Sequence, residues 1–137
     1  LKGLAGISGG TTAQAEHLSF KQIKGVDGFT AELEKAKAAG KTVMLDFYAD
    51  WCVYCKEMEH FTFSDPAVQK ALEGVVLLQA DVTPNDEKDT ELYKYFGIIG
   101  PPSIMFFGAD GEENRNYRVV GFMPADEFSE HVKRALN

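Results

Sequence analysis

Two cysteines, Cys52 and Cys55, are the only ones in this chain of 137 residues. Residues three apart on a helix lie on the same face, so two thiols at this spacing can meet and form a disulfide. The nearly continuous apolar run 42–48 predicts a strand before them, and the pair is expected to open the helix that follows. The unpaired N–H groups and partial positive charge of a helix N-terminus stabilise a thiolate at Cys52. The pair therefore predicts a reversible dithiol/disulfide centre.

A structural disulfide and a metal site are the alternative interpretations of these cysteines. A disulfide that closes so short a loop constrains the unfolded chain very little and would add little stability. His60 extends the pattern to Cys-x2-Cys-x4-His, but structural zinc takes four ligands and the sequence offers no second ligand pair. Redox chemistry is therefore favoured over metal binding, and no metal is expected.

Two carboxylates, Asp46 and Glu59, lie close to the cysteines in the sequence. Asp46 interrupts the apolar run before Cys52, and a buried carboxylate has a raised pKa. Asp46 is therefore expected to lie beneath the pair and to relay protons to or from Cys55. Glu59 follows Cys55 by four residues and falls on the same helical face. The alternatives are an Asp46 that faces solvent at a strand edge and a Glu59 that is an ordinary solvated helix residue.

Length and composition indicate one soluble domain with its own core, and exclude some classes of function. The formal net charge of −7 and the absence of a basic run argue against a nucleic-acid partner. No stretch of the sequence approaches the ~20 apolar residues of a membrane span. No signal peptide is visible, but the first residue is Leu1, so the chain is expected to be a piece of a longer protein.

The remaining pattern predicts an α/β fold. Residues 1–17 are rich in Gly, Ala, Ser and Thr and are expected to form a flexible linker, and residues 18–137 the domain. Strands are predicted over 18–23, 42–48, 75–81, 103–107 and 117–120. Helices are predicted from an Asp27 N-cap to Gly40, from Cys52 to Phe61, from Pro66 to Gly74, from an Asn85 N-cap to Gly97, and from Pro124 onward. This order predicts a central mixed sheet flanked by helices on both faces.

The motif Trp51-Cys52-x-x-Cys55-Lys56 after an apolar strand, with a proline before a later strand, resembles the thioredoxin superfamily. From Leu18 to the C-terminus, the chain more closely resembles the C-terminal periplasmic domain of the DsbD family of bacterial thiol:disulfide interchange proteins. The segments that carry this closer resemblance are 45–59, 61–66, 77–83 and 120–123. The resemblance implies a thioredoxin fold and protein-disulfide reductase activity.

The resemblance also implies roles for the residues around the cysteines. Cys52, first on the helix, would be the more exposed, attacking thiol, and Cys55 the buried thiol that resolves the mixed disulfide. Asp46 and Glu59 would flank the pair, and their negative charge opposes the effect of the helix N-terminus on the pKa of Cys52. In the family the negative charge is understood to prevail, which leaves a reluctant thiol.

A further set of residues is implied to contact the partner protein. Pro102 corresponds to the family's cis-proline that faces the disulfide, and Pro101 departs from the apolar residue that is commoner there. Trp51, Tyr48 and Tyr54 would form an aromatic rim of the site. The alternatives are a plain rigid Pro-Pro turn and aromatic side chains that serve only packing.

The partners implied by the resemblance are other parts of the same polypeptide. Electrons would arrive from a membrane-embedded domain and leave to an N-terminal periplasmic domain, which serves disulfide isomerase and cytochrome c maturation pathways. The domain would be a monomer in isolation, would lie in the periplasm tethered to the inner membrane by residues 1–17, and would need no small-molecule cofactor. A free-standing thioredoxin-like reductase and a metal-binding module remain the rival interpretations.

Overall fold

The computed structural model describes residues 18–137, so the linker predicted over 1–17 lies outside the described residues. A five-stranded sheet forms the centre of the domain, in the order β2-β4-β3-β5-β6. Its strands are β2 (Lys21–Ile23), β3 (Val43–Tyr48), β4 (Val76–Asp81), β5 (Ser103–Phe107) and β6 (Val119–Val120). β2, β4 and β3 pair in parallel, whereas β5 pairs antiparallel with both β3 and β6. The sheet is therefore mixed, as the sequence predicted.

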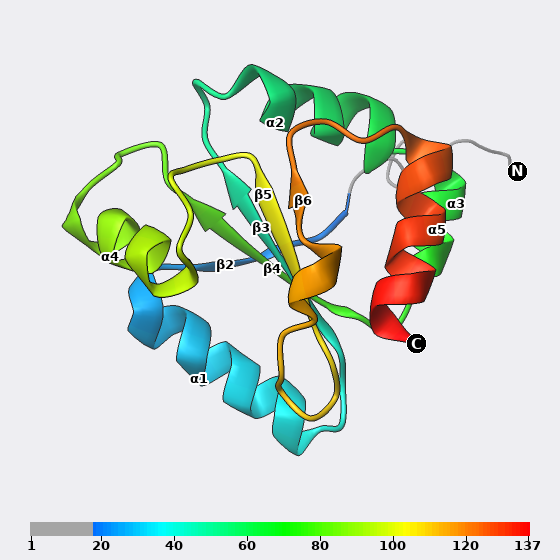
Figure 1. Cartoon of the computed structure of the whole chain (residues 1–137), viewed down its shortest axis with the longest axis horizontal. Helices are drawn as coiled ribbons and strands as arrows, with labels where there is room; N and C mark the ends of the chain where they lie inside the picture. The colour runs from blue at the N-terminus through cyan, green and yellow to red at the C-terminus, as the bar shows by residue number, and fades with distance from the viewer. Residues whose placement is uncertain (1–17) are drawn as a thin grey trace, which may run out of the picture.

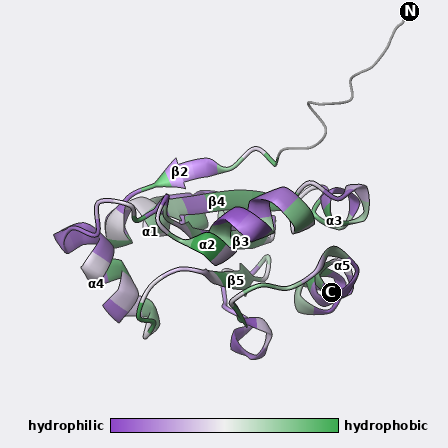
Figure 2. Cartoon of the chain, turned by 90° about the horizontal axis from the view of Figure 1, so that it is seen from above, coloured by the Kyte–Doolittle hydropathy of each residue, from purple (hydrophilic) through white to green (hydrophobic). Residues whose placement is uncertain are grey.

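Helices cover both faces of this sheet. They are α1 (Gly25–Ala38), α2 (Val53–Glu57), the π-helix η2 (Met58–Thr62), α3 (Pro66–Ala71), α4 (Glu87–Phe96), the 3-10 helix η3 (Arg115–Tyr117) and α5 (Ala125–Leu136). Helices α1 and α4 lie on one side of the sheet and α3 and α5 on the other, while α2 crosses the end of β3 (Figure 1). Seen from above, β2, β4, β3 and β5 follow one another between these two helical layers (Figure 2).

The two helical layers bury two separate apolar clusters because side chains alternate along the central strand β3. Leu45 and Phe47 belong to the cluster that includes Phe29 of α1. Met44 belongs to the other cluster, with Phe128 of α5. The strand is buried on both faces, as its nearly continuous apolar sequence predicted.

Two predicted N-caps are wrong. Asp86, not Asn85, caps α4, because its carboxylate accepts from the N–H of Asp89 while the Asp89 carboxylate accepts from the N–H of Asp86. Asn85 instead has a positive φ of 52°. Helix α1 begins two residues before Asp27, which therefore lies in its first turn. The first error arises because Asn85 and Asp86 are adjacent and both have side chains that can cap a helix, and the second because the N-cap of α1, Lys24, makes no side-chain cap hydrogen bond that the sequence could indicate.

The helix after the cysteines also differs from the prediction. A single α-helix was expected to Phe61, but α2 ends at Glu57 and continues as the π-helix η2. The N–H of Phe63 donates to the carbonyl of Met58 over 2.8 Å, which is the i→i+5 bond of a π turn. Thr62 Oγ1 donates to the carbonyl of Met123 over 2.6 Å, so contacts from a distant loop stabilise this turn.

The last predicted strand is shorter than expected. Residues 115–117 form η3, and only Val119 and Val120 pair with β5. The final helix and the start of α3 at Pro66 agree with the sequence-based prediction, and the Asp65 side chain caps α3 by accepting from the N–H of Ala67.

Candidate redox site at the start of helix α2

Cys52 and Cys55 form a disulfide, with their Cα atoms 5.2 Å apart. Cys52 is the N-cap of α2, and its Sγ accepts from the N–H of Cys55 over 3.2 Å. The strand β3 and the turn after it bring the pair to this position, because the N–H of Cys52 donates to the carbonyl of Ala49. The arrangement matches the predicted dithiol/disulfide centre at the start of a helix.

Both cysteines are largely buried. Cys52 is 6% exposed and Cys55 is 4% exposed, so the predicted difference in exposure is small at the level of whole residues. The Cys55 Sγ lies 3.6 Å from the carbonyl oxygen of Phe47, on the strand that also carries Asp46. A partner must therefore reach the disulfide through the residues that surround it.

Asp46 is buried within the central strand, with 5% of its surface exposed. The Gln79 Nε2 donates to Asp46 Oδ2 over 2.9 Å. Burial raises the pKa of Asp46 to about 7, the hydrogen bond from Gln79 opposes this shift, and the negative charge of Glu59 adds to it. The predicted burial is confirmed, the direction of the pKa shift agrees with the prediction, and the alternative of a solvent-facing strand residue is wrong.

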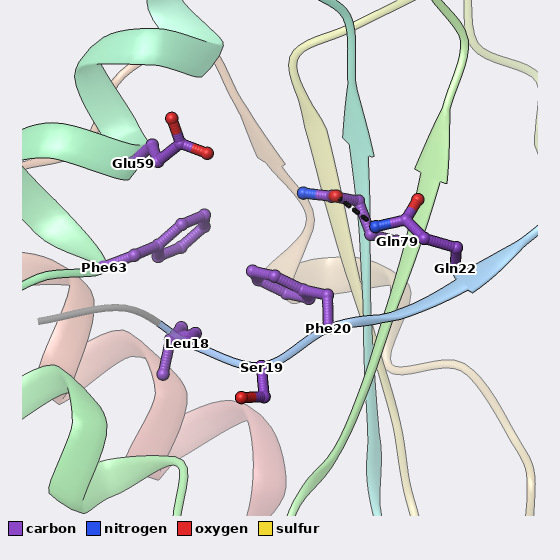
Figure 3. Close-up of a pocket in the computed structure, with 7 residues that line it drawn as sticks. All are labelled: Leu18, Ser19, Phe20, Gln22, Glu59, Phe63 and Gln79. Carbon is purple, nitrogen blue, oxygen red and sulfur yellow. Dashed lines mark hydrogen bonds between the residues drawn. The ribbon is translucent and has the colours of Figure 1, made fainter. Parts of the chain in front are cut away.

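Glu59 reaches the same region from η2. Its side chain is exposed, and it lines a pocket together with Gln79 (Figure 3). Its charge acts on the buried Asp46 carboxyl, so the two predicted carboxylates belong to one electrostatic group. The expectation that Glu59 influences the cysteines directly stays a prediction.

This pair of carboxylates leads to a first prediction, made for the reduced protein. We expect Asp46→Asn combined with Glu59→Gln to lower the pKa of Cys52, because removing nearby negative charge favours the thiolate. The rate of alkylation at Cys52 against pH gives this pKa. Glu91→Gln, an exposed carboxylate on α4, is the control that should leave the pKa unchanged. An unaltered Cys52 pKa in the double variant would contradict the role of the two carboxylates.

Two predicted rim residues, Trp51 and Tyr54, are 55% and 54% exposed. The indole Nε1 of Trp51 donates to the carbonyl of Thr83 over 3.0 Å, and the N–H of Asp50 donates to Thr83 Oγ1 over 2.9 Å. Thr83 thus ties the loop before the cysteines to the end of β4, and no role was predicted for it. The sequence signal that could have pointed to Thr83 was Asp81, two residues earlier, because an Asp at this spacing favours a local turn. Its Oδ1 accepts from the N–H of Thr83.

The Pro101–Pro102 peptide bond is cis, as expected from the resemblance. Both prolines line an apolar pocket of about 360 Å³. Ile99 and Val120 line the same pocket and are 101% and 76% exposed. These two apolar side chains were not predicted as partner contacts, because a single exposed aliphatic residue gives no signal in sequence. That Pro102 faces the disulfide stays a prediction.

The part of the chain that the structure describes contains no group of three or more His, Cys, Asp or Glu side chains that could hold a metal ion. Nor does any helix within residues 18–137 combine the length and the apolar character that crossing a membrane requires.

Comparison with known proteins places this site in a family. The model of a thioredoxin-like domain family matches residues 29–136. The structure is similar to the crystal structure of the DsbD C-terminal domain of Neisseria meningitidis in the oxidised form. In that match the TM-score is 0.72 and the identity 34%, over 84% of this chain and 99% of that chain. The chain belongs to the thioredoxin-like DsbD C-terminal domain family.

Other comparisons agree with this membership. The reduced form of the Neisseria meningitidis DsbD C-terminal domain matches with a TM-score of 0.64 and 37% identity, over 77% of this chain and 96% of that one. The thiol:disulfide interchange protein DsbD of Escherichia coli K12 is 55% identical over 123 residues, which is 89% of this chain. The chain spans only 21% of the length of that relative. That relative's name describes thiol:disulfide interchange, and in this chain the cysteine pair forms the Cys52–Cys55 disulfide.

Proposed function

We propose that this domain relays electrons between other parts of a DsbD polypeptide by dithiol/disulfide exchange. The observation that carries the proposal is a buried Cys52–Cys55 disulfide at the end of the strand that carries the buried Asp46, in a chain that spans 21% of a DsbD relative. The electron donor would be a membrane-embedded domain and the acceptor an N-terminal periplasmic domain, which supplies disulfide isomerase and cytochrome c maturation pathways. The domain would comprise residues 18–137, be tethered to the inner membrane on its periplasmic side, and be monomeric in isolation.

The reaction would begin with the reduced domain. The Cys52 thiolate attacks one sulfur of the partner disulfide, so that a mixed disulfide forms and the partner's other sulfur leaves as a thiolate. The Cys55 thiolate then attacks the Cys52 Sγ, which forms the Cys52–Cys55 disulfide and releases the second partner thiolate. Two electrons pass to the partner, and the protons of the two domain thiols end on the two partner thiols.

Asp46 would handle the proton of Cys55. A base for this thiol must lie nearby and have a pKa close to the working pH. Asp46 is adjacent to Phe47, whose carbonyl oxygen lies 3.6 Å from the Cys55 Sγ, and burial raises the Asp46 pKa to about 7. Glu59 would add negative charge that keeps the Cys52 thiol protonated until the partner binds.

The partner would dock around the exposed rim of the site. Trp51 and Tyr54 expose aromatic surface beside the cysteines, and Pro101 and Pro102 line the apolar pocket that also contains Ile99. Exposed aromatic and apolar groups near a buried reactive bond suit a protein partner, since large exposed apolar patches mark interaction surfaces.

Trapping the covalent intermediate tests the relay. In Cys55→Ala the resolving thiol is missing, so we expect a stable mixed disulfide between Cys52 and a cysteine of its partner. The variant would replace this domain in a full-length DsbD expressed in bacterial membranes, and mass spectrometry would identify the linked peptides. Cys52→Ser with Cys55→Ala is the matched control and should trap nothing.

The outcomes separate the relay from its rivals. Peptides from the other domains of the same polypeptide would support the relay. Peptides only from unrelated soluble proteins would support a free-standing thioredoxin-like reductase. Stoichiometric zinc in the reduced domain, without disulfide exchange, would support a metal-binding module.

A further inference from the structure

A pocket of about 350 Å³ lies between the edge strand β2 and the π-helix η2. Phe20 and Gln22 line it from the β2 segment, Glu59 and Phe63 from the region of η2, and Gln79 from β4 (Figure 3). This pocket shares no lining residue with the apolar pocket at the cis Pro101–Pro102 bond. One of its polar side chains, Gln79, donates a hydrogen bond to the buried Asp46.

Gln22, Gln79 and Asp46 form a row across three adjacent strands. Gln22 on β2 is in register with Gln79 on β4, and Gln79 is in register with Asp46 on β3. The Gln22 Nε2 donates to Gln79 Oε1 over 2.7 Å, and the Gln79 Nε2 donates to Asp46 Oδ2 over 2.9 Å. Exposure falls along the row, from the exposed Gln22 through the partly buried Gln79 to the buried Asp46.

The orientation of the Gln79 amide matters because its two ends have opposite chemistry. An amide nitrogen only donates hydrogen bonds and an amide oxygen only accepts them. The end that faces Asp46 is the nitrogen, which favours an ionised carboxylate, since that form has no hydrogen to donate. A Gln79 turned by half a rotation would present its oxygen and favour the protonated acid. The Gln22 bond to Gln79 Oε1 opposes this rotation, because it would break unless the Gln22 amide turned at the same time.

We propose that Gln22 is a positioning residue that locks the Gln79 amide with its N–H group toward Asp46, so that the edge strand β2 favours the ionised carboxylate of the redox site. The lock acts against two influences that favour the protonated acid, the burial of Asp46 and the charge of Glu59. The two residues in register with Asp46 on the neighbouring strands are uncharged: Gln79 on β4 and Ile104 on β5. The disulfide carries no titrating thiol in the oxidised protein.

The role of Gln22 rests on the proton-handling role proposed above for Asp46, but its test measures the protonation of the Asp46 carboxyl directly. Activity of the domain in electron transfer does not enter the measurement. A result against electron transfer between the domains therefore leaves the positioning role of Gln22 standing. A result against the positioning role of Gln22 likewise leaves the proposed electron transfer standing.

Carbon-13 NMR titration of the Asp46 carboxyl in the oxidised protein tests the lock. In Gln22→Met, which keeps the length of the side chain but removes the amide, we expect the proton affinity of Asp46 to rise about fivefold, the value of one neutral hydrogen bond. Gln79→Met removes the donor to the carboxylate and should raise this affinity more than about tenfold. Because Gln22 acts only through Gln79, the double variant should match Gln79→Met alone.

Two controls keep the result interpretable. Ser19→Ala changes another residue of the same pocket and should leave the Asp46 titration unchanged. In the unsubstituted protein, the side-chain amide signals of both Gln22 and Gln79 should shift with the same midpoint as the Asp46 carboxyl, and Asp46→Asn should abolish both shifts. An Asp46 proton affinity that is unchanged in Gln22→Met, or a Gln22 amide that does not respond to the titration, would overturn the proposal.

Discussion

Replacing Cys52 with serine should slow disulfide reduction by at least about a thousandfold, because the thiolate and not the hydroxyl is the attacking group. We expect that the other cysteine cannot replace it, since Cys55 lies one turn farther along the helix and its Sγ lies 3.6 Å from the carbonyl oxygen of Phe47 on β3. Stopped-flow absorbance with an aromatic disulfide and the reduced domain gives the rate of the first attack.

Cys55→Ala is the comparison that assigns the order of the two thiols. It should keep the first attack within about tenfold of the unsubstituted rate but stop after one turnover, with the adduct held on Cys52. The opposite pattern, with fast attack in Cys52→Ser and none in Cys55→Ala, would assign the nucleophile to Cys55 instead.

Asp46→Asn should make the oxidised protein more resistant to unfolding at neutral and alkaline pH. Burial raises the pKa of Asp46 from 3.8 to about 7 in the folded state, so the folded protein holds this proton more tightly than the unfolded chain does. The resulting stabilisation is complete below the unfolded pKa and is lost as the pH rises through the folded pKa. Between about pH 5 and about pH 8, this loss amounts to about 2–3 kcal/mol in the free energy of unfolding.

Urea denaturation of both proteins at these two pH values gives the comparison. The Asn variant lacks the titrating carboxyl, so its free energy of unfolding should change less between them. The lowered pKa values of Glu32 and Asp86 affect stability only at lower pH, because these contributions are lost as the pH falls below the usual carboxyl range. Asp50→Asn, an exposed carboxylate near the same site, is the control and should retain the full change. An Asp46→Asn protein with the same pH dependence as the parent would contradict a raised Asp46 pKa.

The residues whose chemistry depends on nearby sequence were the predictable ones. The Cys-x-x-Cys spacing predicted the disulfide at the start of a helix, and the apolar residues around Asp46 predicted its burial. The cis bond before Pro102 was expected from family resemblance alone, since spacing does not determine it.

The residues that sequence did not reveal act through distant contacts. Gln79 reaches Asp46 only because β4 pairs with β3 in one particular register, and a period-two pattern does not fix the register of strands far apart in the chain. Thr83 holds Trp51 in place across a gap of 32 residues. The π turn after α2 depends on Thr62 and Met123, which are 61 residues apart. Each requires tertiary structure that local propensity does not encode.

The position of β3 in the sheet has a consequence for hydrogen exchange. Because β3 pairs over most of its length with strands on both sides, we expect its amide hydrogens to exchange with solvent only when the domain unfolds as a whole. The strand β6 has two residues and lies at the sheet edge beside Pro102, so we expect it to open at a lower free energy. The disulfide thus follows a strand that is paired on both sides, while Val120 in the apolar pocket belongs to a two-residue edge strand. We therefore expect the β6 wall of the pocket to open to solvent while the strand that positions the sulfur atoms stays closed.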